Sequence, residues 1–368
     1  MNKYITILGN LDRRIIFLLI GLAVLIPLIK PNWVALPIKI DKNTKVVYDS
    51  ISNLKENDKV LLSFAYGAST KPEVHPMAVA LLNHLFSKGV KVYIVSLWPE
   101  GPIMAQQAMS TVKNSGLFNI NDGTDYVMFD YKVGNFVVIK GIADNFRELY
   151  KQDYKGKSIE ELEIMNGIYS VKDFDFVFDF SAGVPGNAEW VQYACDPKKV
   201  PLSSGCTSIM VTDAIPYVES GQLQGILAGM PGAAEYEKLV YEYMVYEQLK
   251  RNGFCNNPSF HSSSQCVNHN FLTEDSCVDA GHKWIEIEKK VATHLYNYKE
   301  LSTFSTEDSC VDAKYEWIQE GNEYINSETK IQKGKAFARM SSQSVAHLLM
   351  VIFIIIGNIA YYYSRKEN

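Results

Sequence analysis

Four side chains with chemical potential follow or end apolar runs of the chain: His75, Glu100, Asp179 and Cys206. A cysteine thiol becomes a nucleophile when a general base lies within hydrogen-bond reach, and His75 is the base that could serve Cys206. Glu100 and Asp179 would form a second reactive pair if folding brought them equally close. The reaction class that these groups indicate is hydrolysis.

Each of the four residues also has a structural interpretation. His75 precedes a proline and could cap the helix that follows, and Glu100 lies in a Pro/Gly turn that water can solvate. Asp179 lies in an otherwise aromatic strand, where a buried acid needs a partner. Cys206 could pair with Cys195 instead of reacting.

Small polar residues in the same loops are candidate ligand contacts: Ser69, Thr70, Ser181, Gly183 and Thr207. Ser181 lacks the Gly-x-Ser-x-Gly context of a nucleophile elbow, which favours a binding hydroxyl. The turn 183–186 precedes a predicted helix, whose N-terminus could hold an anion. Neither GxGxxG after a strand nor GxxxxGK[ST] occurs, so we predict no cofactor bound through a phosphate motif. No metal is predicted either, because the Cys/His spacings of the chain contain no CxxC pair.

These residues must be positioned by alternating strands and helices. Apolar runs predict strands at 59–66, 90–98, 125–129, 136–142, 174–180 and 202–211. Helical spacing predicts helices at 46–54, 77–88, 103–113, 159–165, 187–194 and 233–251. Near-continuous apolar strands interleaved with helices are typical of an α/β fold, with a mostly parallel, Rossmann- or flavodoxin-like sheet flanked by helices. Ligands bind such sheets at the carboxyl ends of the strands, which is where the candidates lie.

Extreme hydrophobicity is confined to the two ends of the chain. Residues 15–29 (IIFLLIGLAVLIPLI) carry no charge and follow Arg13 and Arg14. We predict transmembrane helices at 15–36 and 344–363, because about 20 residues cross a bilayer. A cleaved signal peptide is the alternative for the first segment, although no small-x-small cleavage site follows it. The polar His347 and Asn358 are expected to pair the two spans.

Two spans divide the chain into cytoplasmic tails at 1–14 and 364–368 and a central part on the opposite side. The central part comprises an α/β domain at 44–251 and an insert at 252–334. The insert repeats TEDSCVDA at 273–280 and 306–313, each copy followed by Trp-Ile. Such identity indicates an internal repeat.

Four cysteines of the insert are disulfide candidates: Cys255, Cys266, Cys277 and Cys310. A polar segment that is poor in aliphatic residues commonly relies on disulfides, which need an oxidising compartment. Our preferred pairing is Cys255–Cys266 and Cys277–Cys310, although four cysteines allow three connectivities. Free thiols and a zinc site with the neighbouring histidines are the alternatives. Disulfides place the central domain outside the cytoplasm.

Glycines recur at Gly221, Gly225 and Gly229. Four-residue spacing places them on one face of a predicted helix, which allows close helix–helix approach. We expect either tight packing inside the domain or a contact with a second copy or another membrane subunit.

Composition excludes several classes of protein. The 368 residues contain 36 Lys and Arg against 41 Asp and Glu, for a formal net charge of −5. This balance is unlike a strongly basic nucleic-acid binder, and the 47% hydrophobic content is unlike a disordered chain.

Several segments together resemble an uncharacterised family of two-pass prokaryotic membrane proteins that hold an α/β domain between their anchors. They are 12–17 (DRRIIF), 62–67 (LSFAYG), 97–102 (LWPEGP), 179–183 (DFSAG), 221–223 with 232–237, and 346–347 with 357–358. The likeness omits 252–334 and implies no activity. The architecture is also similar, more distantly, to auxiliary subunits of gliding-type ABC transporters, but fold analogy does not give function.

The expected function is that of a scaffold or binding subunit in the cell (inner) membrane, with its domain extracytoplasmic. Its expected partners are the lipid bilayer and other membrane subunits or a second copy, and not nucleic acid. A membrane-tethered hydrolase using the strand-end groups is the alternative. A sensor is a weaker possibility, because the short tails leave no room for a signalling domain.

Overall fold

The computed structural model describes residues 13–29, 38–252, 254–256, 316–318, 340, 345, 348–356 and 358–359. The chain divides into two compact units. The first comprises Met1–Ser110, Ile120–Lys238 and Lys333–Asn368, and the second comprises Thr111–Asn119 and Leu239–Gln332. The sheet and all the candidate catalytic residues belong to the first unit.

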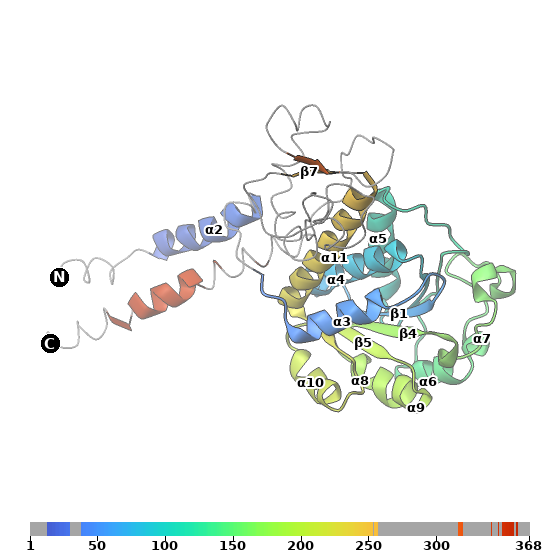
Figure 1. Cartoon of the computed structure of the whole chain (residues 1–368). Helices are drawn as coiled ribbons and strands as arrows, with labels where there is room; N and C mark the ends of the chain where they lie inside the picture. The colour runs from blue at the N-terminus through green and yellow to red at the C-terminus, as the bar shows by residue number, and fades with distance from the viewer. Residues whose placement is uncertain are drawn as a thin grey trace. The chain divides into compact units, whose positions relative to one another are not determined.

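One parallel sheet of six strands forms the centre of the described part of the first unit (Figure 1). Its strands are β1 (Lys59–Ala65), β2 (Lys91–Ser96), β3 (Tyr126–Met128), β4 (Phe176–Ser181), β5 (Leu202–Cys206) and β6 (Ile226–Ala228). Their order across the sheet is β3-β2-β1-β4-β5-β6. The direction of winding therefore reverses between β1 and β4, as in doubly wound, Rossmann-like folds. The predicted α/β class is confirmed.

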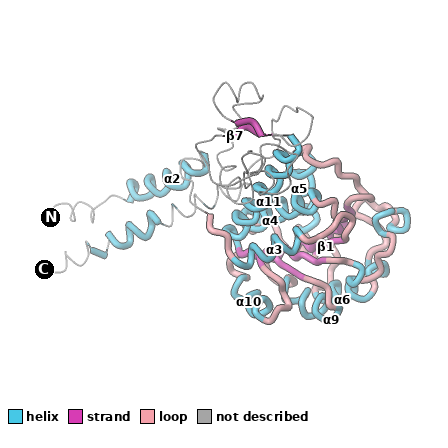
Figure 2. The backbone as a smooth tube through the Cα atoms, in the orientation of Figure 1, coloured by secondary structure: helices cyan, strands magenta, loops and turns pink. Residues whose placement is uncertain are grey.

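Helices cover both faces of this sheet (Figures 1 and 2). One face carries α3 (Lys42–Ser52), α4 (Lys71–Ser87) and the beginnings of α5 (Gly101–Asn114) and α11 (Gly229–Asn252). The other carries α6 (Phe136–Asp144), α7 (Phe146–Leu149), α8 (Asn187–Trp190), α9 (Asp196–Lys198) and α10 (Val211–Glu219). With helices on both sides, the strands are buried on both faces, which explains their near-continuous apolar sequences.

The strand β4 illustrates how its sequence divides between the two faces. Phe178 and Phe180 point to one face, where their ring centroids lie 4.9 Å apart and the Phe64 ring of β1 packs at a tilt with its centroid 5.0 Å from that of Phe180. Val177 and Asp179 alternate with them and point to the other face. The single acid in this strand is therefore directed into the core beneath α8.

Residues 136–142 are helical, and the predicted strand there is wrong. They form α6, in which Val138, Ile139 and Ile142 are buried while Phe136 and Val137 are 47% and 61% exposed. This spacing buries one face of a helix, whereas a strand would bury alternate residues. The β-branched content of the segment indicated the wrong element, because packing against the sheet outweighs β-propensity.

Two further predicted elements are shorter than expected. The strand predicted at 202–211 ends at Cys206, and α10 begins at Val211. The helix predicted at 159–165 is instead a pair of 3-10 turns, Ile159–Glu161 and Glu163–Met165.

The three spaced glycines do not share a helical face, contrary to the prediction. Gly221 follows α10 with φ +77°, Gly225 precedes β6, and Gly229 begins α11 with φ +58°. A Cβ on Gly225 would lie 2.8 Å from the carbonyl oxygen of Asn43 in α3, so close packing inside the domain requires this glycine. Their proposed role in a subunit contact stays a prediction.

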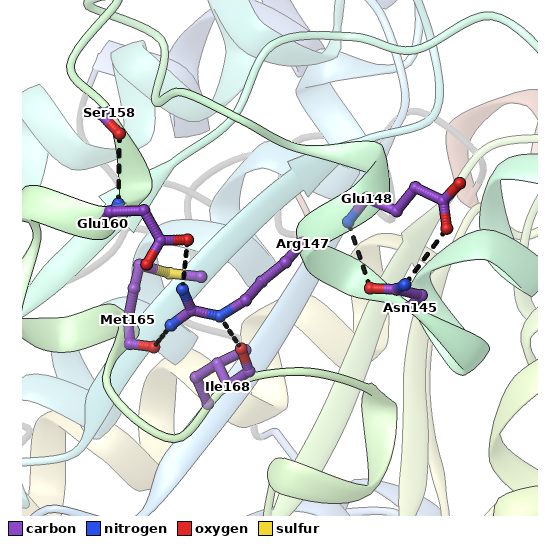
Figure 3. Close-up of polar contacts among 7 residues, drawn as sticks. All are labelled: Asn145, Arg147, Glu148, Ser158, Glu160, Met165 and Ile168. Carbon is purple, nitrogen blue, oxygen red and sulfur yellow. Dashed lines mark hydrogen bonds and ion pairs between the residues drawn. The ribbon is translucent and has the colours of Figure 1, made fainter.

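Arg147 forms hydrogen bonds with the long irregular segment between α7 and β4 (Figure 3). Its Nε donates to the carbonyl oxygen of Ile168 at 2.7 Å, and one terminal nitrogen donates to that of Met165. The other terminal nitrogen lies 2.7 Å from Glu160. One guanidinium therefore satisfies two backbone carbonyls of a segment that has no strand to pair with.

The described residues give a partial view of the predicted membrane segments. The helix α2 spans Arg13–Ile29, and 30–36 lie outside the described residues. Within the described residues, no helix combines the length and the apolar character that a membrane crossing requires. Near the C-terminus, the Asn358 amide donates to the carbonyl oxygen of Ile354 at 2.9 Å, one turn earlier. His347 lies outside the described residues.

Two short strands are described in the second unit. β7 (Phe254–Asn256) and β8 (Glu316–Ile318) are antiparallel, and Cys255 lies opposite Trp317 in the register. Cys266, Cys277 and Cys310 lie outside the described residues, so the disulfides and the zinc alternative stay predictions.

Candidate functional site

The loops that follow β1, β2, β4 and β5 meet at one edge of the sheet. The reversal of winding between β1 and β4 separates the loop 66–70 from the loop 182–186, and ligands of open α/β sheets bind at this point. The sequence correctly placed the candidate residues at this edge. Their contacts decide what they can do.

Glu100 closes the loop after β1. Its Oε2 accepts a hydrogen bond from the backbone N–H of Ala68 at 2.6 Å. A Cβ on Gly67 would lie 1.8 Å from the same oxygen, so glycine is needed there for the carboxylate to approach. A carboxylate of the protein itself thus occupies the backbone donor at which an anion would bind.

The loops after β4 and β5 are closed in the same way. Glu189 accepts from the backbone N–H of Gly186 at 2.7 Å, and Glu73 accepts from that of Ser208 at 2.7 Å and from its hydroxyl. The anion site predicted at 183–186 is therefore filled by Glu189. Three carboxylates at one edge repel phosphate, because like charges raise the cost of binding an anion.

His75 is paired with a tyrosine. Its Nδ1 lies 2.9 Å from the hydroxyl oxygen of Tyr66, whose pKa burial raises well above the ordinary value. Either tautomer of His75 can make this bond, so Nδ1 and the phenol are engaged with each other whichever of them donates. A ring nitrogen held in such a structural bond is less available as a general base.

Cys206 is a buried thiol at the end of β5. Burial, and then the charges of Asp179 and Glu73, raise its pKa to about 12. A nucleophilic cysteine needs a lowered pKa, because the thiolate is the reactive form. Cys206 is therefore protonated near neutral pH. Cys195 and Cys206 are both free, so the alternative pairing between them does not occur.

Asp179 is the buried acid of β4. It lies opposite Ser63 of β1 and Ser204 of β5, and the indole of Trp190 donates to the Ser63 hydroxyl at 3.0 Å. Burial and the charge of Glu189 raise its pKa to about 7, while the hydroxyls of Ser63 and Ser181 oppose this shift. Neither hydroxyl makes a well-formed hydrogen bond to the carboxyl group, whose two oxygens have no partner.

The predicted ligand contacts fall into two groups. Ser181, Gly183 and Thr207 lie together, because the Ser181 hydroxyl donates to the Gly183 carbonyl at 3.3 Å and the Thr207 N–H donates to the Ser181 carbonyl at 3.2 Å. Thr70 instead turns to the Gly67 carbonyl in the loop after β1, where Ser69 is exposed.

Four residues of this edge were not singled out from the sequence: Glu73, Trp98, Asn187 and Glu189. Each lies within or beside a predicted strand-end loop, so position was the one available signal. Their contacts depend on residues distant in the sequence. No group of three or more His, Cys, Asp or Glu side chains gathers to hold a metal ion in the part of the chain that the structure describes.

No protein-family model, curated protein or solved structure matches the chain.

Proposed function

We propose that this protein is a scaffold or binding subunit of a membrane protein complex, of which a transport complex is one example. It would be anchored in the cell (inner) membrane, with its α/β domain on the extracytoplasmic side. The observation that supports a role without catalysis is the engagement of the strand-end groups. Glu100 closes a loop, His75 pairs with a tyrosine, and Cys206 keeps its proton.

Apolar side chains on the terminal helices support anchoring. Phe17 and Leu18 of α2 are 70% and 63% exposed, and Leu348 and Ile354 near the C-terminus are 63% and 62% exposed. Exposed apolar surface of this kind is typical of a site that contacts lipid or a partner protein. Insertion into a bilayer would cover it.

The hydrolase alternative requires a reactive pair at the sheet edge. A cysteine nucleophile is disfavoured by the raised pKa of Cys206, and Glu100 is committed to the Ala68 N–H. Substituting Cys206 by alanine tests what remains of this alternative. Loss of a hydrolytic activity with the fold intact would favour the enzyme.

Complex membership is tested by gentle detergent extraction of the tagged full chain, followed by native mass spectrometry. We expect defined subunits at fixed stoichiometry, whereas an unrelated tagged two-pass protein should yield none of them. A monomer with nothing attached would contradict the proposal.

Topology is tested by thiol labelling on intact cells. Cys195 and Cys206 are buried, so a membrane-impermeant maleimide applied to the native protein reports on the insert cysteines. We expect labelling after treatment with a membrane-impermeant reductant, and little labelling before it. Insert thiols that are reached only after the cells are lysed would reverse the proposed orientation.

A further inference from the structure

The corner between the end of β4 and the start of α8 contains buried polar atoms that nothing in the described residues satisfies. Both carboxyl oxygens of Asp179, both amide atoms of Asn187 and the indole Nε1 of Trp98 have no hydrogen-bond partner. Asp179 and Asn187 are 0% exposed. A buried polar group without a partner costs about 1–3 kcal/mol, so such a concentration calls for an explanation.

Packing around the turn 182–186 brings these groups to one corner. A Cβ on Gly183 would lie 3.0 Å from the Trp98 ring, and a Cβ on Gly186 would lie 1.9 Å from the Ser181 hydroxyl oxygen. Asn187 directly follows Gly186, and Asp179 points to the same face of β4 as Ser181. The Trp98 ring therefore packs against this turn, and Asp179 and Asn187 lie shortly before and directly after it in the chain.

The backbone after this turn is also unusual. The helix α8 continues as a π-helical turn, Val191–Cys195. Such turns are rare and frequently mark functional sites, because the inserted residue redirects the neighbouring side chains. This one begins directly after Trp190. The Trp190 indole donates to the hydroxyl of Ser63, the residue opposite Asp179 in the sheet.

The charges that act on the corner are negative. Burial is the largest cause of the raised pKa values of Asp179, Cys195 and Cys206. After burial, Glu189 raises the pKa of Asp179, Asp179 and Asp196 raise that of Cys195, and Asp179 and Glu73 raise that of Cys206. An anionic ligand would meet repulsion here, whereas a cation would compensate the buried acid. The unpartnered N–H groups of Asn187 and Trp98 additionally need an acceptor.

We propose that this corner binds a small primary amine that also carries a neutral oxygen, the chemistry of an amino alcohol. The ammonium group would donate to Asp179, and the hydroxyl oxygen would accept from Asn187 and Trp98. Because Asp179 and Asn187 are both 0% exposed, binding of the amine would require the turn 182–186 to move aside. The inference rests on the binding role proposed above and names its ligand class.

Ethanolamine is the probe, tested on the full chain in detergent by calorimetry and thermal unfolding. We expect a saturable rise in Tm with ethanolamine, because a ligand that binds the folded state stabilises it. Ethylene glycol, which lacks the ammonium group, and inorganic phosphate should give no saturable shift. Equal shifts in Tm with ethylene glycol and ethanolamine would overturn the proposal. They would indicate that water forms the hydrogen bonds of the buried polar atoms at this corner.

Matched variants locate the site. Asp179→Asn should abolish ethanolamine binding, and Trp98→Phe, which removes the N–H and keeps the ring, should weaken it about ten-fold. Ser203→Ala is the control, because Ser203 is also buried without a partner but points to the opposite face of the sheet. Binding retained in Asp179→Asn, or lost equally in Ser203→Ala, would contradict the assignment. Subunit co-purification without ethanolamine binding would contradict this inference alone, and the reverse result would contradict complex membership alone.

Discussion

At the scale of single residues, buried titratable groups couple the fold to pH. His84 of α4 is fully buried, with Nδ1 2.9 Å from the Tyr236 hydroxyl oxygen and Nε2 3.3 Å from that of Ser52. Its ring stacks on Tyr48 with centroids 4.9 Å apart. Together these contacts join α3, α4 and the start of α11 on one face of the sheet.

His84 should make the fold less stable in acid. Burial, and then Lys88, lower its pKa from 6.5 to about 3. The unfolded chain therefore binds the proton first, so this contribution to stability is complete above pH 6.5 and is lost as the pH falls toward 3. Urea unfolding at pH 7 and pH 4.5 measures the loss. A His84→Gln variant should show a smaller loss, and an unchanged loss would contradict the assignment.

Asp179 should act in the opposite direction. Its pKa is raised from 3.8 to about 7, so the folded state holds the proton more tightly than the unfolded state does. The resulting cost is absent below pH 3.8, grows as the pH rises toward 7 and is complete above it. Asp179→Asn should therefore be more stable than the natural chain at pH 8, by a few kilocalories per mole in order of magnitude. Chemical unfolding at pH 8 and pH 4 checks this, since the gain should shrink at the lower pH.

At the scale of elements, side-chain contacts hold an irregular segment that no strand ladder holds. The segment between α7 and β4 has 3-10 turns and depends on Arg147 for two of its backbone carbonyls (Figure 3). A cation–π contact with Tyr169, at 4.9 Å from the guanidinium to the ring centroid, adds to this anchor.

Arg147→Ala should destabilise the fold by about 2–3 kcal/mol, because it leaves carbonyls without their charged donor. The matched control is Glu160→Ala, which removes only the ion pair with Arg147. The Glu160 side chain is 70% exposed, so this loss should cost less than about 1 kcal/mol. Urea unfolding gives both free energies, and limited proteolysis should cut the Arg147→Ala variant within 151–173. Equal costs for the two variants would mean that the ion pair, rather than the carbonyl contacts, holds the segment.

At the scale of the whole molecule, the described sheet and its helices lie within 38–252, although α11 continues from the first compact unit into the second. Both sheet faces are covered by helices from this range (Figure 2). The described helices that pack on the sheet therefore all come from the continuous range 38–252.

A fragment of residues 38–252 should accordingly fold alone. We expect one cooperative urea transition and circular dichroism typical of an α/β protein, because the fragment retains the six strands and the helices on both faces. A fragment lacking β6 and α11 is the matched comparison and should unfold more easily. A gradual, non-cooperative loss of signal from the 38–252 fragment would show that the remaining chain is needed.

Local sequence predicted β1, β2 and β4 well, because each is an apolar run bounded by polar or turn residues. It failed at 136–142, where β-branched residues pack as a helix, and at 221–229, where glycine spacing suggested a helix in place of turns and β6. It also placed the candidate residues at the correct edge, since strand ends can be located one strand at a time.

The sequence by itself determined the alternation of strands and helices and the edge at which the polar residues gather, because both follow from patterns between near neighbours. Only the tertiary structure decided that β1 lies beside β4, that Ser63 faces Asp179, and that the protein's own carboxylates occupy the loop N–H groups. These contacts join residues far apart in the chain. Burial and neighbouring charges set the protonation of Asp179 and Cys206, and neither exists until the sheet has assembled.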